Sequence, residues 1–157
     1  MNGAHVHLLL NHVPVLGSFF ALCLLLYGVF ARSKPIVNAA LFAVIITTVI
    51  GIPAYLSGEE AEHVVQPVLG INHDALEEHE EMAEIALWVM LMNGVIALAA
   101  FVTGRKKEAA VSPLTWVALA GLLITSVLMA RTGGSGGEIR HSEINLTVDP
   151  ANHERGE

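Results

Sequence analysis

Residues 15–31 read VLGSFFALCLLLYGVFA, and this apolar run decides the fold class of the chain. It belongs to an apolar segment, 8–31, that is long enough to cross a bilayer, since a spanning helix needs about 17 to 25 such residues. Three similar segments follow, at 35–57, 82–103 and 113–130. A backbone in lipid must satisfy its own hydrogen bonds, and no segment alternates as a membrane strand does. We therefore predict an all-α fold, a four-helix transmembrane bundle.

The composition supports a membrane protein and excludes several other classes. Of the 157 residues, 54% are hydrophobic and only 15% are charged, whereas soluble domains carry about 25% charged residues. The net charge of −7 argues against nucleic acid as a partner, because such proteins present basic surfaces. Cys23 is the only cysteine, which excludes a disulfide within the chain.

The distribution of Lys and Arg predicts the orientation. The first connection holds Arg32 and Lys34, the third holds Arg105, Lys106 and Lys107, and the second, 58–81, has no basic residue. Positive charge marks cytoplasmic loops, so we expect both termini on the outer, periplasmic side of a bacterial inner membrane. Residues 1–131 would form the transmembrane domain and 132–157 a flexible, Gly-rich tail. In this topology all eight histidines fall on the outer side, at positions 5, 7, 12, 63, 73, 79, 141 and 153.

The second connection is acidic. Residues 59–66 are expected to form a short amphipathic helix, which Pro67 and Gly70 would end, and Asn72 is a plausible N-cap for the next helix. Glu84 lies two residues inside the following apolar run. A carboxylate at such a depth is usually paired or functional.

Histidine positions point to a cofactor. His12 is the deepest imidazole of the first segment, and His79 lies one turn before the third becomes apolar. Two imidazoles on facing helices are what a b-type haem requires, so we predict His12 and His79 as axial ligands. Arg131 and Arg140 are the expected partners of the haem propionates. Further candidates, which could serve a second haem, are His5, which shares a face with His12, and also His7 and His141.

A non-haem metal site is the competing chemistry. Glu60 and His63 have the i, i+3 spacing found in di-iron bundles, and His79 and Glu84 would complete the set. His73 and Glu77 are spaced i, i+4, which suits zinc. Each fragment occurs once, and exposed His and Glu pairs are mostly surface residues.

Several short motifs resemble a family of bacterial four-helix membrane proteins of unknown function. The motif HLLLNHVP has His7, His12 and Pro14 at that family's spacing, and SGEE, 57–60, follows the second segment. A histidine opens the third segment in HEEMAEIALW, and Gly136, Gly137 and EIRHSEI follow the fourth. The chain departs from the family at Val13, where an aromatic residue is common. Some relatives are fused to Rieske iron–sulfur domains, so the resemblance implies electron transfer, and it favours pairing His7 with His12.

Three functional readings remain open. The first is a haem b electron carrier that works near the outer face as a subunit of a larger redox complex, a role that points away from enzyme activity without deciding it. The second is a non-catalytic accessory subunit of a respiratory or photosynthetic membrane complex. The third is the carboxylate–histidine metal site. All three place the chain in a lipid bilayer beside other membrane subunits or redox proteins.

Overall fold

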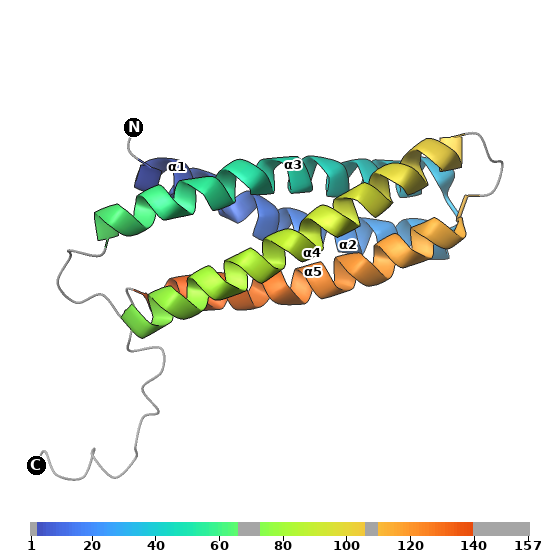
Figure 1. Cartoon of the computed structure of the whole chain (residues 1–157). Coiled ribbons are helices and arrows are strands. Elements are labelled where there is room, and N and C mark those ends of the chain that lie inside the picture. The colour runs from blue at the N-terminus through green and yellow to red at the C-terminus, as the bar shows by residue number, and fades with distance from the viewer. Residues whose placement is uncertain (1–2, 66–72, 106–109, 140–157) are drawn as a thin grey trace, which may run out of the picture.

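The computed structural model describes residues 3–65, 73–105 and 110–139, and these residues form helices and no strand. The helices are α1 (Gly3–Leu10), α2 (His12–Phe30), α3 (Lys34–Val65), α4 (His73–Arg105) and α5 (Pro113–Glu138) (Figure 1). Since only Asn11 separates α1 from α2, they form one apolar stretch, Gly3–Phe30. Counted with α3, α4 and α5, this makes four helices long and apolar enough to cross a membrane. The prediction of an all-helical, four-span protein is confirmed.

Proline explains the break between α1 and α2. Pro14 has no N–H, so the carbonyl of Leu10, four residues earlier, loses its helical hydrogen-bond donor. The regular helical hydrogen bonding is interrupted at the next residue, Asn11, although the backbone of Asn11 remains helical, with φ of −59° and ψ of −28°. The first span therefore consists of two helical pieces that meet near one end of the bundle.

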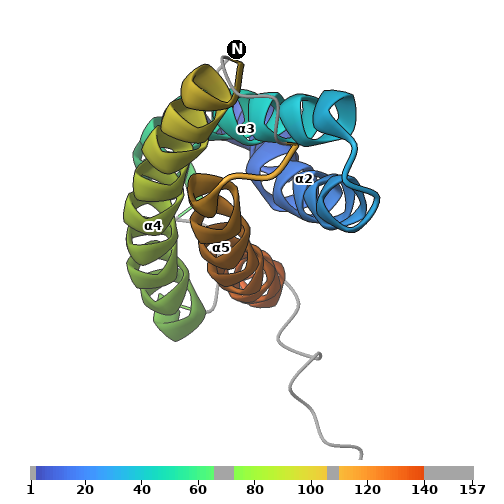
Figure 2. The ribbon, with the colours of Figure 1, turned by 90° about the vertical axis from the view of Figure 1, so that its right-hand side faces the viewer.

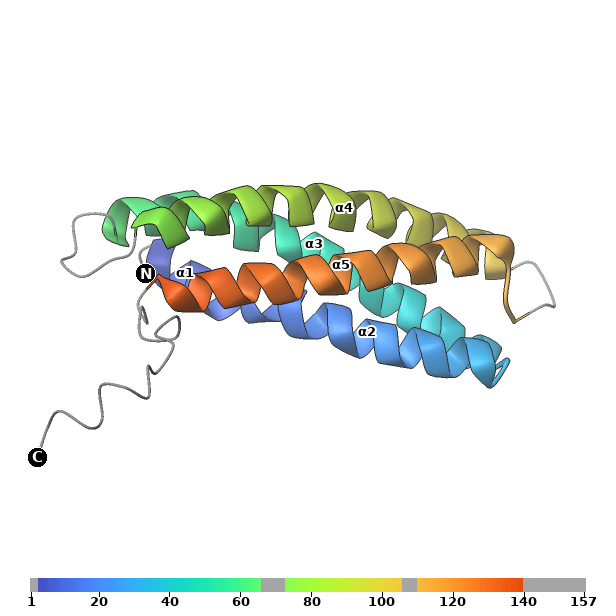
Figure 3. The same ribbon diagram turned by 90° about the horizontal axis from the view of Figure 1, so that it is seen from below.

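The spans pack in a ring around a common axis. α3 packs against α2 and α4, α5 packs against α4 and α2, and α1 packs against α3. The views along the axis and from below show this arrangement (Figures 2 and 3). The first and third spans are therefore diagonal to each other, as are the second and the fourth. Large apolar side chains such as Phe20, Phe30 and Val95 point away from the axis and are exposed, as a lipid-facing surface requires.

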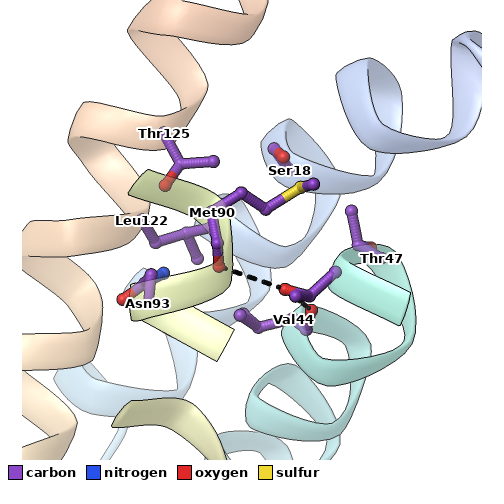
Figure 4. Close-up of a pocket in the computed structure, with 8 residues that line it drawn as sticks. Ser18, Val44, Thr47, Met90, Asn93, Leu122 and Thr125 are labelled. Carbon is purple, nitrogen blue, oxygen red and sulfur yellow. Dashed lines mark hydrogen bonds between the residues drawn. The ribbon is translucent and has the colours of Figure 1, made fainter. Parts of the chain in front are cut away.

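Small and hydroxyl-bearing residues hold the middle of the bundle together. Gly94 of α4 lies against Thr48 of α3, whose hydroxyl donates to Val44 O at 2.9 Å and reaches Met90 O at 3.4 Å. The Asn93 amide, oriented by its neighbours on α5, donates to Ala118 O at 3.1 Å. Figure 4 shows the side chains at this level, which leave no room for a water molecule between them: Ser18, Val44, Thr47, Met90, Asn93, Leu122 and Thr125. Most of the hydroxyls at this level donate to carbonyl oxygens of their own helices, so we interpret these residues as contacts that pack the helices together.

The two ends of the bundle differ in chemistry. We call one the histidine end; it contains residues 3–8, 58–65, 73–80 and 131–139. The other, the basic end, contains residues 29–38, 100–105 and 110–115. Figures 1 and 3 show the N-terminus, the end of α3, the start of α4 and the end of α5 together at the histidine end.

Two helices extend further than the sequence indicated. The segment expected to form a separate amphipathic helix, 59–66, continues α3 without interruption as far as Val65, and Gln66 lies outside the described residues. The fourth span was expected to end at residue 130, before a flexible tail. Instead, α5 runs through the glycines of 133–137 to Glu138. Residues 140–157 lie outside the described part.

Candidate functional site

Each span has a line of buried residues, here called its stripe, that faces the bundle axis. The four stripes all lead to the histidine end. On the first span the stripe of buried residues includes Pro14, Ser18, Ala21 and Leu25, and steps of three and four residues extend it back to His7. The α4 stripe extends in the same way from Ala97 through Asn93, Met90 and Ala86 to His79. The α3 and α5 stripes end at Gly58 and Gly136. The histidine end thus gathers two imidazoles and two glycines, one residue from each span.

His7 is held by α3. Its Nδ1 lies 2.9 Å from the carbonyl oxygen of Ala54, and since a carbonyl only accepts, Nδ1 is the donor. Gly58, one turn further along α3, lies beside the same ring edge: a Cβ there would be 3.5 Å from His7 Cε1 and Nδ1. The ring is partly buried. The His7 tautomer and its orientation are therefore set by backbone atoms of another span.

His79 is held in the same way by α5. Its Nδ1 donates to the carbonyl oxygen of Thr132 at 2.9 Å, and the Ser135 hydroxyl lies 3.3 Å from the same nitrogen. That hydroxyl also donates to Thr132 O at 3.1 Å. A Cβ at Gly136 would come within 3.0 Å of His79 Cε1, so glycine provides the clearance for this ring.

The two rings meet across the bundle axis. Their centroids are 6.4 Å apart and their planes are nearly perpendicular, at 88°. Because the first and third spans are diagonal, this contact joins two helices that are not neighbours in the ring. Because Nδ1 of each ring is used by a carbonyl oxygen, Nε2 is the nitrogen that remains for a metal. Metal-binding histidines commonly show this arrangement, with Nδ1–H donated to a carbonyl and Nε2 left for the metal.

The structure pairs His79 with His7 and not with His12, the partner predicted from depth. His12 is exposed, and its Nδ1 lies 3.3 Å from the carbonyl oxygen of Leu8 on its own helix. The reason is helical register: His12 falls between the steps of the buried stripe, whereas His7 lies on it. The pairing of His7 with His12 that the resemblance favours also places one ring on the axis and the other outside.

The other candidates are scattered. His5 is exposed on α1, His63 is exposed on α3, and Arg131 is exposed on α5 at the histidine end. His141 and Arg140 lie outside the described residues. Glu60 is exposed where the N-terminus of α1 closely approaches α3, at Gly3.

The set proposed for a carboxylate–histidine metal site is not assembled. Glu60, His63 and Glu84 are exposed, whereas His79 faces the axis. Within residues 3–65, 73–105 and 110–139, no three His, Cys, Asp or Glu side chains come close enough to hold a metal ion.

Asn11 is a residue of this site that the sequence did not single out. It lies one turn after His7 on the same face, and its Oδ1 is buried with no hydrogen-bond partner among the described residues. Ala54, Thr132 and Ser135 were also missed. Thr132 could have been found by following the buried residues of α5 toward the histidine end in steps of three and four residues, since it follows Met129 by three. Ala54 contributes only a backbone oxygen, which no side-chain pattern reveals.

Comparison of the chain with family models, with curated proteins and with solved structures gave no match.

Proposed function

We propose that this chain is an electron-transfer protein of a bacterial inner membrane that binds a b-type haem through His7 and His79. One observation carries the proposal: two imidazoles from diagonal spans converge on the axis, and Nδ1 of each ring is fixed on a carbonyl oxygen, so that Nε2 is the nitrogen left for a metal. Bis-histidine ligation requires this state of both rings. When bound, the haem would supply a one-electron redox centre.

The spacing of the rings fits such a role. Two imidazoles on opposite sides of one metal have centroids about 6 Å apart, because each metal–nitrogen bond is about 2 Å long and each ring centroid lies about 1 Å beyond its nitrogen. The His7 and His79 centroids are 6.4 Å apart. The glycines at positions 58 and 136 keep side-chain atoms away from the ring edges, and the unpartnered Oδ1 of Asn11 offers a polar contact to an occupant. Arg131 is the described cation at this end that is available to a propionate.

The proposed orientation places the site on the periplasmic side. Arg32, Lys34 and Arg105 lie at the basic end, and the positive-inside rule assigns that end to the cytoplasm. Electrons would then enter and leave near the outer surface, through a redox protein or a neighbouring membrane subunit. The chain's own residues would position and insulate the cofactor.

A second candidate is an accessory subunit without a cofactor. The observation in its favour is that the same two hydrogen bonds tie α1 to α3 and α4 to α5, as a purely structural clasp would. In that case the histidines would stabilise a surface that docks on a larger complex.

An optical spectrum of the purified protein tests the proposal. We expect a sharp reduced band of the b type and about one haem per chain in a haem assay. His7→Gln and His79→Gln should each lose most of the haem, while His12→Gln, a matched change of an exposed histidine on the same span, should keep it.

Three outcomes would contradict the haem proposal. They are a colourless wild-type protein from haem-sufficient cells, full haem content in His7→Gln or His79→Gln, and haem loss confined to His12→Gln. A colourless protein whose His7→Gln variant folds but leaves its complex would instead establish the accessory role.

A further inference from the structure

The last two turns of α5, residues 132–138, lie beside the start of α4 at the histidine end (Figures 1 and 3). There the Thr132 carbonyl oxygen and the Ser135 hydroxyl are 2.9 Å and 3.3 Å from His79 Nδ1. A Cβ at Gly136 would be 3.0 Å from Cε1 of the same ring. We call residues 132–138 the glycine segment. It closes the α5 side of the histidine site.

The glycine segment has a low helix propensity that packing does not explain. Four of its seven residues are glycines. Only Gly136 has a close neighbour: a Cβ at Gly133 would lie 3.8 Å from Val15, which is ordinary contact, and a Cβ at Gly134 or Gly137 would meet nothing within 4 Å. Each glycine lowers the helix–coil equilibrium about fivefold relative to alanine. The segment therefore contains three glycines that weaken the helix without making room for a neighbour.

Burial does little to compensate for this weakness. Ser135 is the only buried residue of the glycine segment, and it has no apolar side chain. By contrast, the part of α5 that precedes the segment buries Leu122 and Met129, and the start of α4 buries Ala75 and Leu76. Segments with few buried apolar contacts open locally at a low cost in free energy. We therefore expect the glycine segment to unwind while the rest of α5 stays helical.

Unwinding of the glycine segment would expose both imidazoles. It would remove Ser135 and Gly136 from the ring of His79, and the ring of His7 lies directly behind, with its centroid 6.4 Å away. The middle of the bundle leaves no room for a water molecule between its side chains, so a group as wide as a haem can enter only where a helix gives way.

We propose that the glycine segment is a gate, which unwinds to let a cofactor reach Nε2 of His7 and His79 and then rewinds over it. Rewinding returns the Thr132 carbonyl oxygen to His79 Nδ1 and so restores the orientation of the ring. The identity of the group that passes the gate rests on the proposed function, whereas the opening itself does not.

Modification of histidines by diethylpyrocarbonate tests the gate in the full chain, expressed in haem-deficient cells and purified in detergent. The reagent acylates accessible neutral imidazoles, and peptide mass spectrometry gives the rate at each histidine. The double substitution Gly134→Ala and Gly137→Ala strengthens the segment without adding a contact, so modification of His79 should slow about tenfold. His12, which is exposed, should react at the same rate in both proteins.

A matched control is Gly104→Ala, at the far end of α4. Its Cβ also meets nothing within 4 Å, and it should leave the rate at His79 unchanged. The single substitutions Gly134→Ala and Gly137→Ala cover the case in which the double variant does not fold. Each of them should slow modification of His79 about fivefold or less.

Amide hydrogen exchange gives a second measurement of the opening. In the wild-type chain, amides of residues 133–138 should exchange faster than those of residues 122–129, and the alanine substitutions should slow them. Unchanged modification of His79 in the folded variants would overturn the gate, as would exchange in the glycine segment as slow as in 122–129. Neither measurement needs haem. A protein that meets both expectations but never binds haem would contradict the proposed function and leave the gate established.

Discussion

The position of the His79 imidazole requires a glycine, with no Cβ, at position 136. Gly136 lies so close to the ring that a Cβ would be 3.0 Å from Cε1 and 3.2 Å from Nδ1. The ring cannot easily withdraw, because Nδ1 is bonded to Thr132 on the same helix as the glycine. An added side chain at position 136 must therefore displace either the ring or α5.

We predict opposite effects for two alanine substitutions on α5. Gly134→Ala meets no atom within 4 Å, so it should stabilise the helix by up to about 1 kcal/mol through propensity alone. Gly136→Ala gains the same propensity but crowds His79, which typically costs about 1–3 kcal/mol. Unfolding in a mixed-detergent titration measures both variants. Equal stabilities of Gly134→Ala and Gly136→Ala would show that the ring is not held as described.

The sequence predicted that the site is made of histidine side chains, but it did not predict which histidine of the first span faces the axis. It drew attention to imidazoles at the outer ends of the first and third spans and predicted His79 on the third. It did not distinguish His7 from His12, because depth in the apolar run favours His12, whereas the helical register of the buried residues favours His7. The hydrogen bonds to Ala54 and Thr132 could not be predicted, since they depend on which carbonyl oxygens the neighbouring spans present.

At the scale of elements, the close approach of α3 and α4 depends on small residues. Gly94 lets the backbone of α4 approach Thr48, where a Cβ would be 2.7 Å from Cγ2 and 2.8 Å from Oγ1. Small residues at such crossings bring helices together in lipid, where no hydrophobic force drives association. The same contact positions Thr48 to reach the carbonyl of Met90 on the neighbouring span.

A pair of substitutions on α4 tests this packing. Gly94→Ala should lower the free energy of unfolding by about 1–3 kcal/mol, because Thr48 is buried and cannot move away freely. Gly104→Ala, at the end of the same helix, meets nothing within 4 Å and should have little effect or a slightly stabilising one. The same detergent titration applies, and a Gly94→Ala protein as stable as Gly104→Ala would contradict the close approach.

The existence of the helices followed from hydropathy, but their ends did not. Length and apolar content predicted four spans because lipid leaves the backbone no alternative. The glycines after Thr132 predict a flexible segment because glycine has a low helix propensity, yet α5 includes them. Tertiary contacts explain the difference, since Gly133 lies against Val15 and Gly136 lies against His79. Such contacts are invisible in a propensity scale.

For the molecule as a whole, charge is sorted along the bundle axis. The basic end carries Arg32, Lys34 and Arg105, while the described carboxylates lie toward the histidine end of α3, α4 and α5. This asymmetry supports the proposed orientation with both termini outside.

Chemical labelling tests the orientation. In a Cys23→Ser background, Glu59→Cys at the histidine end should react with a membrane-impermeant maleimide in intact spheroplasts. Arg32→Cys at the basic end should react only after lysis. Both positions are exposed, so access to the reagent depends on the side of the membrane alone. Labelling of Arg32→Cys before lysis, together with protection of Glu59→Cys, would show that the chain has the opposite orientation in the membrane.

The most direct test of the central claim is electron paramagnetic resonance of the oxidised, purified protein carrying ¹⁵N-labelled histidine. If His7 and His79 hold one haem, the wild-type protein will give a low-spin ferric signal coupled to two histidine nitrogens. His12→Gln will keep both couplings, and His7→Gln or His79→Gln will lose at least one. The absence of a haem signal from the wild-type protein, or two couplings that persist in His7→Gln and His79→Gln, would contradict the account.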